Sequence, residues 1–166
     1  MSEQVNIRKA EETDLRSVTA IMNSFAKNSF AVYAADLLPP TFAQERFDQA
    51  KVFLVLEINN EVIGFGFILP YKPFKNFAFT GVLTYFLREE YTGRGIGSKL
   101  LYKLFEEGKK FGITNYLAHI SSKNEQSLQF HKKHGFREVG RFKEVAIKFD
   151  QLVDVVWVQK IFKPGE

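Results

Sequence analysis

The stretch YTGRGIGSKLL, residues Tyr91 to Leu101, places three glycines at every second position and then continues with good helix formers. Glycine has no Cβ, so the backbone can approach a ligand closely, and a helix that begins there presents unpaired N–H groups and the positive end of its dipole. Together these features favour a site for phosphate oxygens. Gly93, Gly95 and Gly97 also suit a tight strand-to-helix turn, so a purely structural role stays open.

Two well-known phosphate-binding loops do not fit these letters. The dinucleotide-binding motif needs a third glycine three residues after the second, and Ser98 stands at that position. A P-loop ends in Gly-Lys-Ser/Thr, whereas GIGSK reverses that order. Neither a Rossmann-type dinucleotide site nor nucleoside triphosphate hydrolysis is therefore expected.

The patterns around this stretch predict an α/β (α+β) protein with a mixed sheet covered by helices. The expected order is β-α-α-β-β-β-α-β-α-β-β, with about seven strands and about four helices. A capping box at Thr41 and Gln44 predicts the start of the second helix, and Asn59-Asn60 predicts a tight hairpin turn. The near-continuous apolar character of residues 152–162 predicts a last strand buried on both faces. The expected strands are 5–10, 52–58, 61–69, 80–87, 114–120, 136–142 and 152–162, and the expected helices begin near residues 13, 41, 96 and 124.

Composition narrows the possible functions. The 166 residues contain no cysteine, which excludes disulfides, thiolate metal sites and cysteine nucleophiles. The net charge is +4 with scattered Lys and Arg, which favours an anionic small ligand over nucleic acid. No apolar run approaches the roughly 20 residues needed to span a bilayer, so a cytoplasmic protein without membrane contact is expected. The three histidines lack the spacing of a metal site, and no metal is expected.

The glycine-rich stretch resembles the coenzyme A pyrophosphate loop of the GNAT superfamily, Gln/Arg-x-x-Gly-x-Gly/Ala. Gly95 and Gly97 match the pattern, whereas Thr92 replaces the usual Gln or Arg. The segment NEQSLQFHKKHGF resembles a second family segment, in which Asn124 and His131 occupy positions that meet the pantetheine end. The resemblance implies one GNAT domain over residues 1–166, a sheet splayed at its middle, and acetyl-CoA as co-substrate. It further implies that the backbone holds the pyrophosphate and that one N–H of the central strand meets the thioester carbonyl. The residues implied are Gly93, Arg94, Gly95, Ile96, Gly97 and Ser98 for the pyrophosphate, and Phe86, Leu87 or Arg88 for the carbonyl.

Within the superfamily the chain resembles the phosphinothricin and methionine-sulfoximine acetyltransferase branch, through KPFKNF, HKKHGFREVG and IKF…DVVWVQ. In that branch a glutamate early in the central strand is the general base, and Val82 stands at that position. The resemblance implies that His131 is a proton donor or thiol partner, although a structural histidine at the edge of the core is the alternative. His119 is a candidate replacement base, or else a half-buried strand residue, and Tyr85 and Glu45 are further candidates. Lys72, Phe74 and Arg46 match positions of the acceptor pocket, with ordinary loop solvation as the alternative for Lys72.

The expected function is transfer of an acetyl group from acetyl-CoA to a primary amine of a small molecule, such as an amino acid or an analogue. The amine would attack directly in a ternary complex, which agrees with the absence of cysteine. One alternative keeps the coenzyme but uses a protein amine or a polyamine as acceptor. Another is a coenzyme-binding module without transferase activity, which Val82 favours. A homodimer is compatible with the resemblance.

Overall fold

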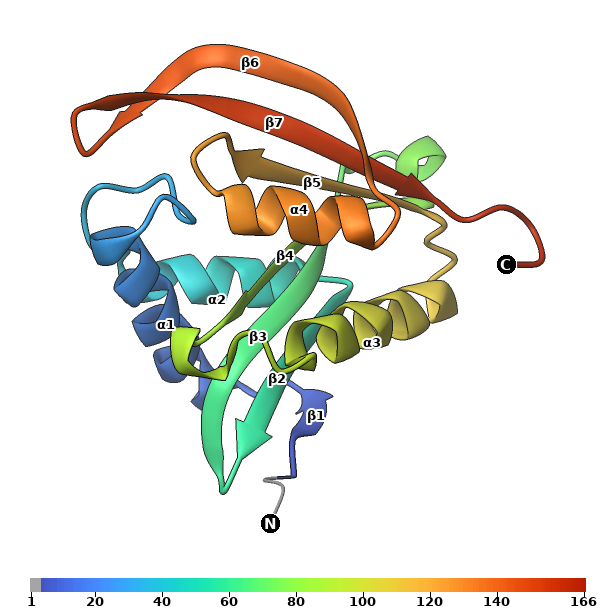
Figure 1. Ribbon diagram of the computed structural model, residues 1–166. Helices are drawn as coiled ribbons and strands as arrows, with labels where there is room; N and C mark the ends of the chain where they lie inside the picture. Colours follow the sequence, from blue (N-terminus) through green and yellow to red (C-terminus); the bar gives the residue numbers. More distant parts are fainter. Residues whose placement is uncertain (1–3) are drawn as a thin grey trace.

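The computed structural model describes residues 4–166, so the first three residues of the expected domain lie outside it. Seven strands form one mixed sheet in the order β1-β2-β3-β4-β5-β7-β6, which confirms the expected fold class (Figure 1). All neighbouring strands are antiparallel except β4 and β5, which are parallel. The strands are β1 (Asn6–Lys9), β2 (Val52–Ile58), β3 (Glu61–Pro70), β4 (Thr80–Leu87), β5 (Asn115–Ser121), β6 (Arg137–Lys148) and β7 (Gln151–Ile161).

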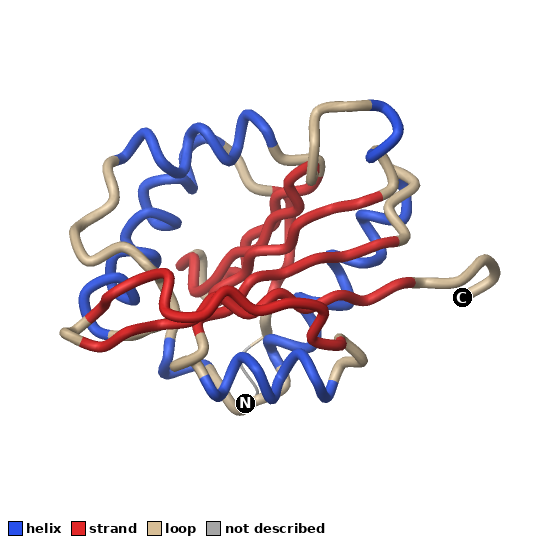
Figure 2. The backbone as a smooth tube through the Cα atoms, turned by 90° about the horizontal axis from the view of Figure 1, so that it is seen from above, coloured by secondary structure: helices blue, strands red, loops and turns tan. Residues whose placement is uncertain are grey.

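Four α-helices cover the two faces of the sheet (Figure 2). They are α1 (Leu15–Asn28), α2 (Pro40–Gln49), α3 (Ile96–Lys110) and α4 (Glu125–Lys133). The core under α1 and α2 contains the aromatic side chains Phe53, Phe65 and Phe67. The core on the other face packs Leu100, Leu101 and Leu104 of α3 against the sheet. No helix within residues 4–166 is long and apolar enough to cross a membrane.

Of the local predictions, the hairpin turn was confirmed, whereas the helix cap and the burial of the last strand were wrong. Asn59 and Asn60 adopt φ values of 50° and 64°, as the hairpin turn between β2 and β3 requires. The capping box predicted at Thr41 was wrong, because the N-cap is Pro39, two residues earlier, and Thr41 lies inside α2, which begins at Pro40. Proline suits this first position, since its missing N–H would have no helical partner there. The expected burial of the last strand on both faces was also wrong, because only Val153, Val156 and Val158 of β7 are buried.

The sheet opens at its middle. Parallel pairing between β4 and β5 covers only Thr80–Val82 against Asn115–Leu117. Beyond these residues the two strands diverge, and Figure 1 shows the gap widening toward their carboxyl ends. The expected splay is therefore present, and it exposes one edge of the second half of β4.

The hairpin of β6 and β7 extends past the end of β5 and reaches the connection between α1 and α2 (Figure 1). The Nζ of Lys148 donates a hydrogen bond to the Val32 carbonyl, and Lys148 is only 3% exposed. The ring of Phe149 meets that of Phe30 edge-on, with 5.2 Å between the centroids. These contacts fix the loop that follows α1 over one side of the gap.

Candidate active site

The glycine-rich loop joins the carboxyl end of β4 to α3. Gly93 and Gly95 have φ values of +74° and +75°, a left-handed conformation that glycine adopts without strain. Gly95 is the N-cap of α3, and the first helical bond runs from the Lys99 N–H to the Gly95 carbonyl. The N–H groups of Ile96, Gly97 and Ser98 therefore lack intrahelical partners. Space is open where a Cβ would stand at Gly93 and Gly95, so the loop fits an anionic group close to its backbone.

Two side chains of the loop are engaged with neighbours. The Thr92 hydroxyl donates to the Glu89 carbonyl at 2.7 Å, so it closes the short 3-10 turn Glu89–Tyr91. The guanidinium of Arg94 lies over the Tyr91 ring, 5.6 Å from its centroid. Arg94 is exposed, and its positive charge adds to that of the helix end.

Strand register separates the three candidate N–H groups of β4. The Arg88 N–H donates to the Ile63 carbonyl at 2.9 Å, and Phe86 lies opposite Phe65 in the same antiparallel ladder. Because N–H groups alternate in direction along a strand, those of Phe86 and Arg88 point toward β3. The N–H of Leu87 points to the other side, into the gap between β4 and β5.

A chain of hydrogen bonds joins α4 to the edge of this gap. The Oδ1 of Asn124 accepts from the Ser127 N–H at 3.2 Å, and the Ser127 carbonyl lies 2.7 Å from His131 Nδ1. A carbonyl can only accept, so Nδ1 carries the proton and Nε2 accepts from the Tyr85 hydroxyl at 2.6 Å. His131 is 4% exposed, and burial lowers its pKa to about 4. Burial also raises the pKa of Tyr85, so both side chains are neutral at neutral pH.

His134 connects the glycine-rich loop to the same helix. Its Nδ1 lies 2.8 Å from the Phe130 carbonyl, and its Nε2 lies 2.9 Å from the hydroxyl of Ser98 in the first turn of α3. A Cβ added at Gly97 would make ordinary contact with Phe130 at 3.6 Å. The amino end of α3 is thus held against α4, which places the glycine-rich loop and the Asn124–His131 face on one side of the sheet.

The opposite side of the gap is aromatic. Side chains alternate between the two faces of a strand. Val82, Thr84 and Phe86 of β4 and His119 of β5 therefore face the side covered by α1 and α2. His119 pairs with Trp157 across β5 and β7, and their ring centroids are 5.0 Å apart. Tyr33, from the loop after α1, stacks on His119 at 5.7 Å. These neighbours desolvate the imidazole and lower the pKa of His119, although one edge of the residue stays exposed.

Residues 17–136 match the family model described as the acetyltransferase (GNAT) family. The chain belongs to this family. It is accordingly an acyltransferase, and the splayed sheet with its glycine-rich loop is the GNAT arrangement.

Similar proteins agree with this assignment. The chain is 27% identical to an L-methionine sulfoximine/L-methionine sulfone acetyltransferase of Pseudomonas aeruginosa over 164 residues, 96% of this chain and 95% of the relative. It is 31% identical to a solved ribosomal-protein-alanine N-acetyltransferase from Brucella melitensis, with a TM-score of 0.83 and coverage of 95% and 99%. The fold also matches a GNAT phosphinothricin acetyltransferase from Sinorhizobium meliloti solved with acetyl-CoA, at 24% identity, TM-score 0.87 and coverage of 97% and 90%. The expected likeness to the phosphinothricin and methionine-sulfoximine branch is confirmed.

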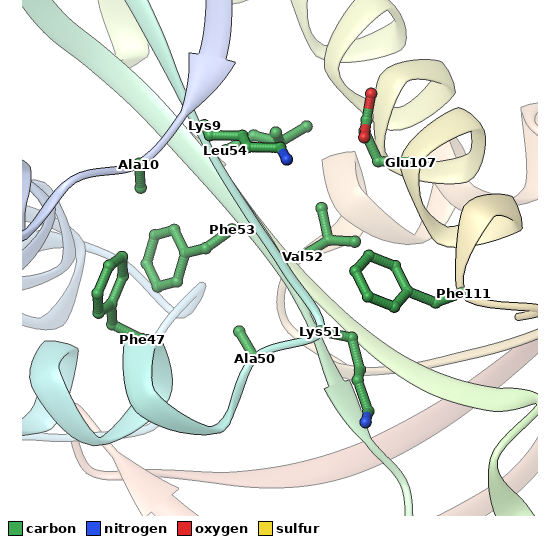
Figure 3. A pocket seen from close by; sticks show the side chains of 10 residues that line it. All are labelled: Lys9, Ala10, Phe47, Ala50, Lys51, Val52, Phe53, Leu54, Glu107 and Phe111. Atoms are coloured by element: carbon green, nitrogen blue, oxygen red, sulfur yellow. The ribbon is translucent and has the colours of Figure 1, made fainter.

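Two of the three expected acceptor residues, Lys72 and Phe74, lie apart from the gap between β4 and β5. Lys72 and Phe74 lie in the β3–β4 connection, which meets β4 at Thr80, the end where β4 and β5 are still paired. They line a hollow with Gln49 and Ile113, and Phe74 is 63% exposed. The guanidinium of Arg46 stacks on Phe42 of its own helix at 3.7 Å. A further hollow, between Phe47 and Phe111, also lies away from the glycine-rich loop (Figure 3).

Sequence patterns did not single out several residues that shape the site. Trp157 stood in a strand expected to be wholly buried, yet it is half-buried and faces His119. Lys148 lies in the segment IKF that carries part of the resemblance, but its contact with Val32, 116 positions away in the chain, follows from no local pattern. Tyr33 lies in the loop after α1, and only the fold shows that its ring stacks on His119. The one available signal was the density of aromatic residues in that loop.

Proposed function

We propose that this GNAT protein transfers the acetyl group of acetyl-CoA to a primary amine of a small molecule, by direct attack in a ternary complex. The observation that carries the proposal is the gap between β4 and β5, with the glycine-rich loop on one side and an uncharged face on the other. The names of the Pseudomonas and Sinorhizobium relatives support a small-molecule acceptor. The Brucella relative, named for a protein acceptor, keeps a protein amine as the second candidate.

Backbone N–H groups and one side chain would bind acetyl-CoA. The N–H groups of Ile96, Gly97 and Ser98 hold the pyrophosphate at the positive end of α3. The N–H of Leu87 polarises the thioester carbonyl and stabilises the negative charge that develops on its oxygen. The Oδ1 of Asn124 is occupied by the helix cap, so its Nδ2 is the group that meets the pantetheine arm. Acetyl-CoA supplies the activated acetyl group.

We propose that the sulfur departs as the thiolate and takes its proton from solvent, because the one hydrogen of the Tyr85 hydroxyl is donated to His131 Nε2 and burial raises the pKa of Tyr85. His131 has no proton on Nε2 and a pKa of about 4, so at neutral pH it orients the Tyr85 hydroxyl and does not itself donate. On the amine side, Val82 cannot accept a proton. His119, neutral because its pKa is lowered, is the group that can take one.

Calorimetric titration with acetyl-CoA, followed by thiol release in the presence of amines, tests this proposal. Binding in the micromolar range, about −8 kcal/mol, together with amine-dependent thiol release, is the expected result. His119→Ala should reduce kcat while leaving the affinity for acetyl-CoA unchanged. Absence of binding at millimolar acetyl-CoA would refute the proposal, and binding without release for any amine would favour a module that binds the coenzyme without turnover.

A further inference from the structure

The acceptor side of the gap carries no charged side chain on its three nearest strands. Alternation places three residues of β4, three of β5 and three of β7 on this face. The set holds no carboxylate, ammonium or guanidinium group, and its single titratable member, His119, is kept neutral by its neighbours. The nine residues are Val82, Thr84 and Phe86, then Leu117, His119 and Ser121, and finally Val153, Val155 and Trp157.

Aromatic rings enclose this face from several directions. Trp157 and Tyr33 both pack on His119, with centroids 5.0 and 5.7 Å from its ring. Phe86 forms the other wall, backed by Phe25 of α1 at 5.2 Å. His119 and Trp157 remain partly exposed, so a ligand in the gap can reach them.

The aromatic wall is held in place by the β6–β7 hairpin. The Lys148 ammonium donates a hydrogen bond to the carbonyl of Val32, the residue directly before Tyr33 in the chain. With 3% of Lys148 exposed, this cation is not presented to a ligand. It positions the Tyr33 ring over His119 and adds no charge to the surface that an acceptor would meet.

We propose that the acceptor is a primary amine with an apolar or aromatic body, bound between Tyr33, Trp157 and Phe86. This inference rests on the proposed function. An acceptor with a phosphinate or carboxylate group, such as the carboxylate of methionine sulfoximine, would lose hydration on this uncharged face without gaining an opposite charge. An apolar body is favoured there because both it and the rings leave water. Val82 fits the same assignment, since a valine in place of a carboxylate enlarges the apolar wall.

Matched amines test the assignment. L-Phenylalaninamide and L-alaninamide share the same reacting group and differ by one phenyl ring, and L-methionine sulfoximine serves as the polar acceptor. Thiol release from acetyl-CoA should give a kcat/KM for phenylalaninamide that exceeds the value for alaninamide by about 10- to 100-fold. Methionine sulfoximine should react more slowly than phenylalaninamide.

Variants locate the preference on the aromatic wall. Trp157→Leu should reduce the ratio between the two amides to a few-fold, whereas Trp157→Phe, which keeps a ring, should retain most of it. Phe111→Leu, an aromatic substitution at the distant hollow, should leave the ratio unchanged. Circular dichroism and acetyl-CoA titration of each variant verify folding and an intact coenzyme side.

The outcomes separate this inference from the proposed function. Equal turnover of the two amides, or faster reaction of methionine sulfoximine, would overturn the apolar acceptor while leaving the acetyltransferase assignment in place. Retention of the full ratio in Trp157→Leu would overturn the location of the site. Acetyl-CoA binding without turnover of any amine would overturn both proposals in favour of a coenzyme-binding module.

Discussion

Acid should destabilise this protein through His131. The ordinary pKa of a histidine imidazole is 6.5. In the folded protein burial lowers the pKa of His131 to about 4, because the residue is only 4% exposed. Between these values the unfolded chain binds a proton at this position and the folded protein does not. The free energy of unfolding therefore falls as the pH falls, and the loss begins near the higher pKa. At about 1.36 kcal/mol per pH unit, protonation of His131 alone should lower the free energy of unfolding by about 2 kcal/mol between pH 6.5 and 5, and by about 3 kcal/mol by pH 4.

Urea unfolding followed at half-unit steps from pH 7 to 5 measures this slope. His131→Gln cannot titrate, so its stability should depend less on pH by about 2 kcal/mol over the same range. Its stability at pH 7 is expected to be lower than that of the wild type, but the slope is the measured quantity. His119→Gln is the matched control. The lowered pKa of His119 also makes stability fall with pH, but this side chain is more exposed, so His119→Gln should change the slope less than His131→Gln does.

Equal slopes for the wild type and His131→Gln would refute the reasoning. They would mean that His131 titrates at its ordinary pKa, and that the Ser127 carbonyl and the Tyr85 hydroxyl do not hold a neutral ring. In that case His131 could carry a proton at neutral pH and could itself supply the proton that the departing sulfur takes up.

Two further predictions concern single positions. Gly95→Val should weaken acetyl-CoA binding by more than tenfold and destabilise the fold by about 1–2 kcal/mol, because φ is +75°. Gly112→Val is its control: φ is +74° and the space is equally open, so calorimetry should find a similar loss of stability with unchanged coenzyme affinity. The hydroxyl of Tyr33 is buried without a hydrogen-bond partner among residues 4–166, so Tyr33→Phe should raise stability by about 1 kcal/mol. For a chain of this size that corresponds to a melting temperature about 2–4 °C higher, and a lower value would show that the hydroxyl has a partner.

Local patterns in the sequence determined much of the fold. The 3.6-residue apolar period of α1 and α3, the Asn59-Asn60 turn and the glycine-rich stretch each depend on residues close together in the chain. Their energetics are local, because helix faces, turn dihedrals and an uncapped helix end are set within a few residues. The resemblance to GNAT proteins then supplied the splay and the coenzyme, neither of which follows from periodicity.

Tertiary structure decided the identity of the groups that face the gap. The N–H of Leu87 is distinguished from those of Phe86 and Arg88 only by the register of β4 against β3. The protonation state of His131 depends on Tyr85, 46 positions away, and on burial that no local pattern reports. The aromatic wall likewise joins Tyr33 and Trp157, from distant parts of the chain, on one imidazole. Such contacts arise from long-range strand pairing and packing. The sequence by itself therefore determined the elements and the glycine-rich turn before α3, and the fold decided which side chains meet and in which charge state.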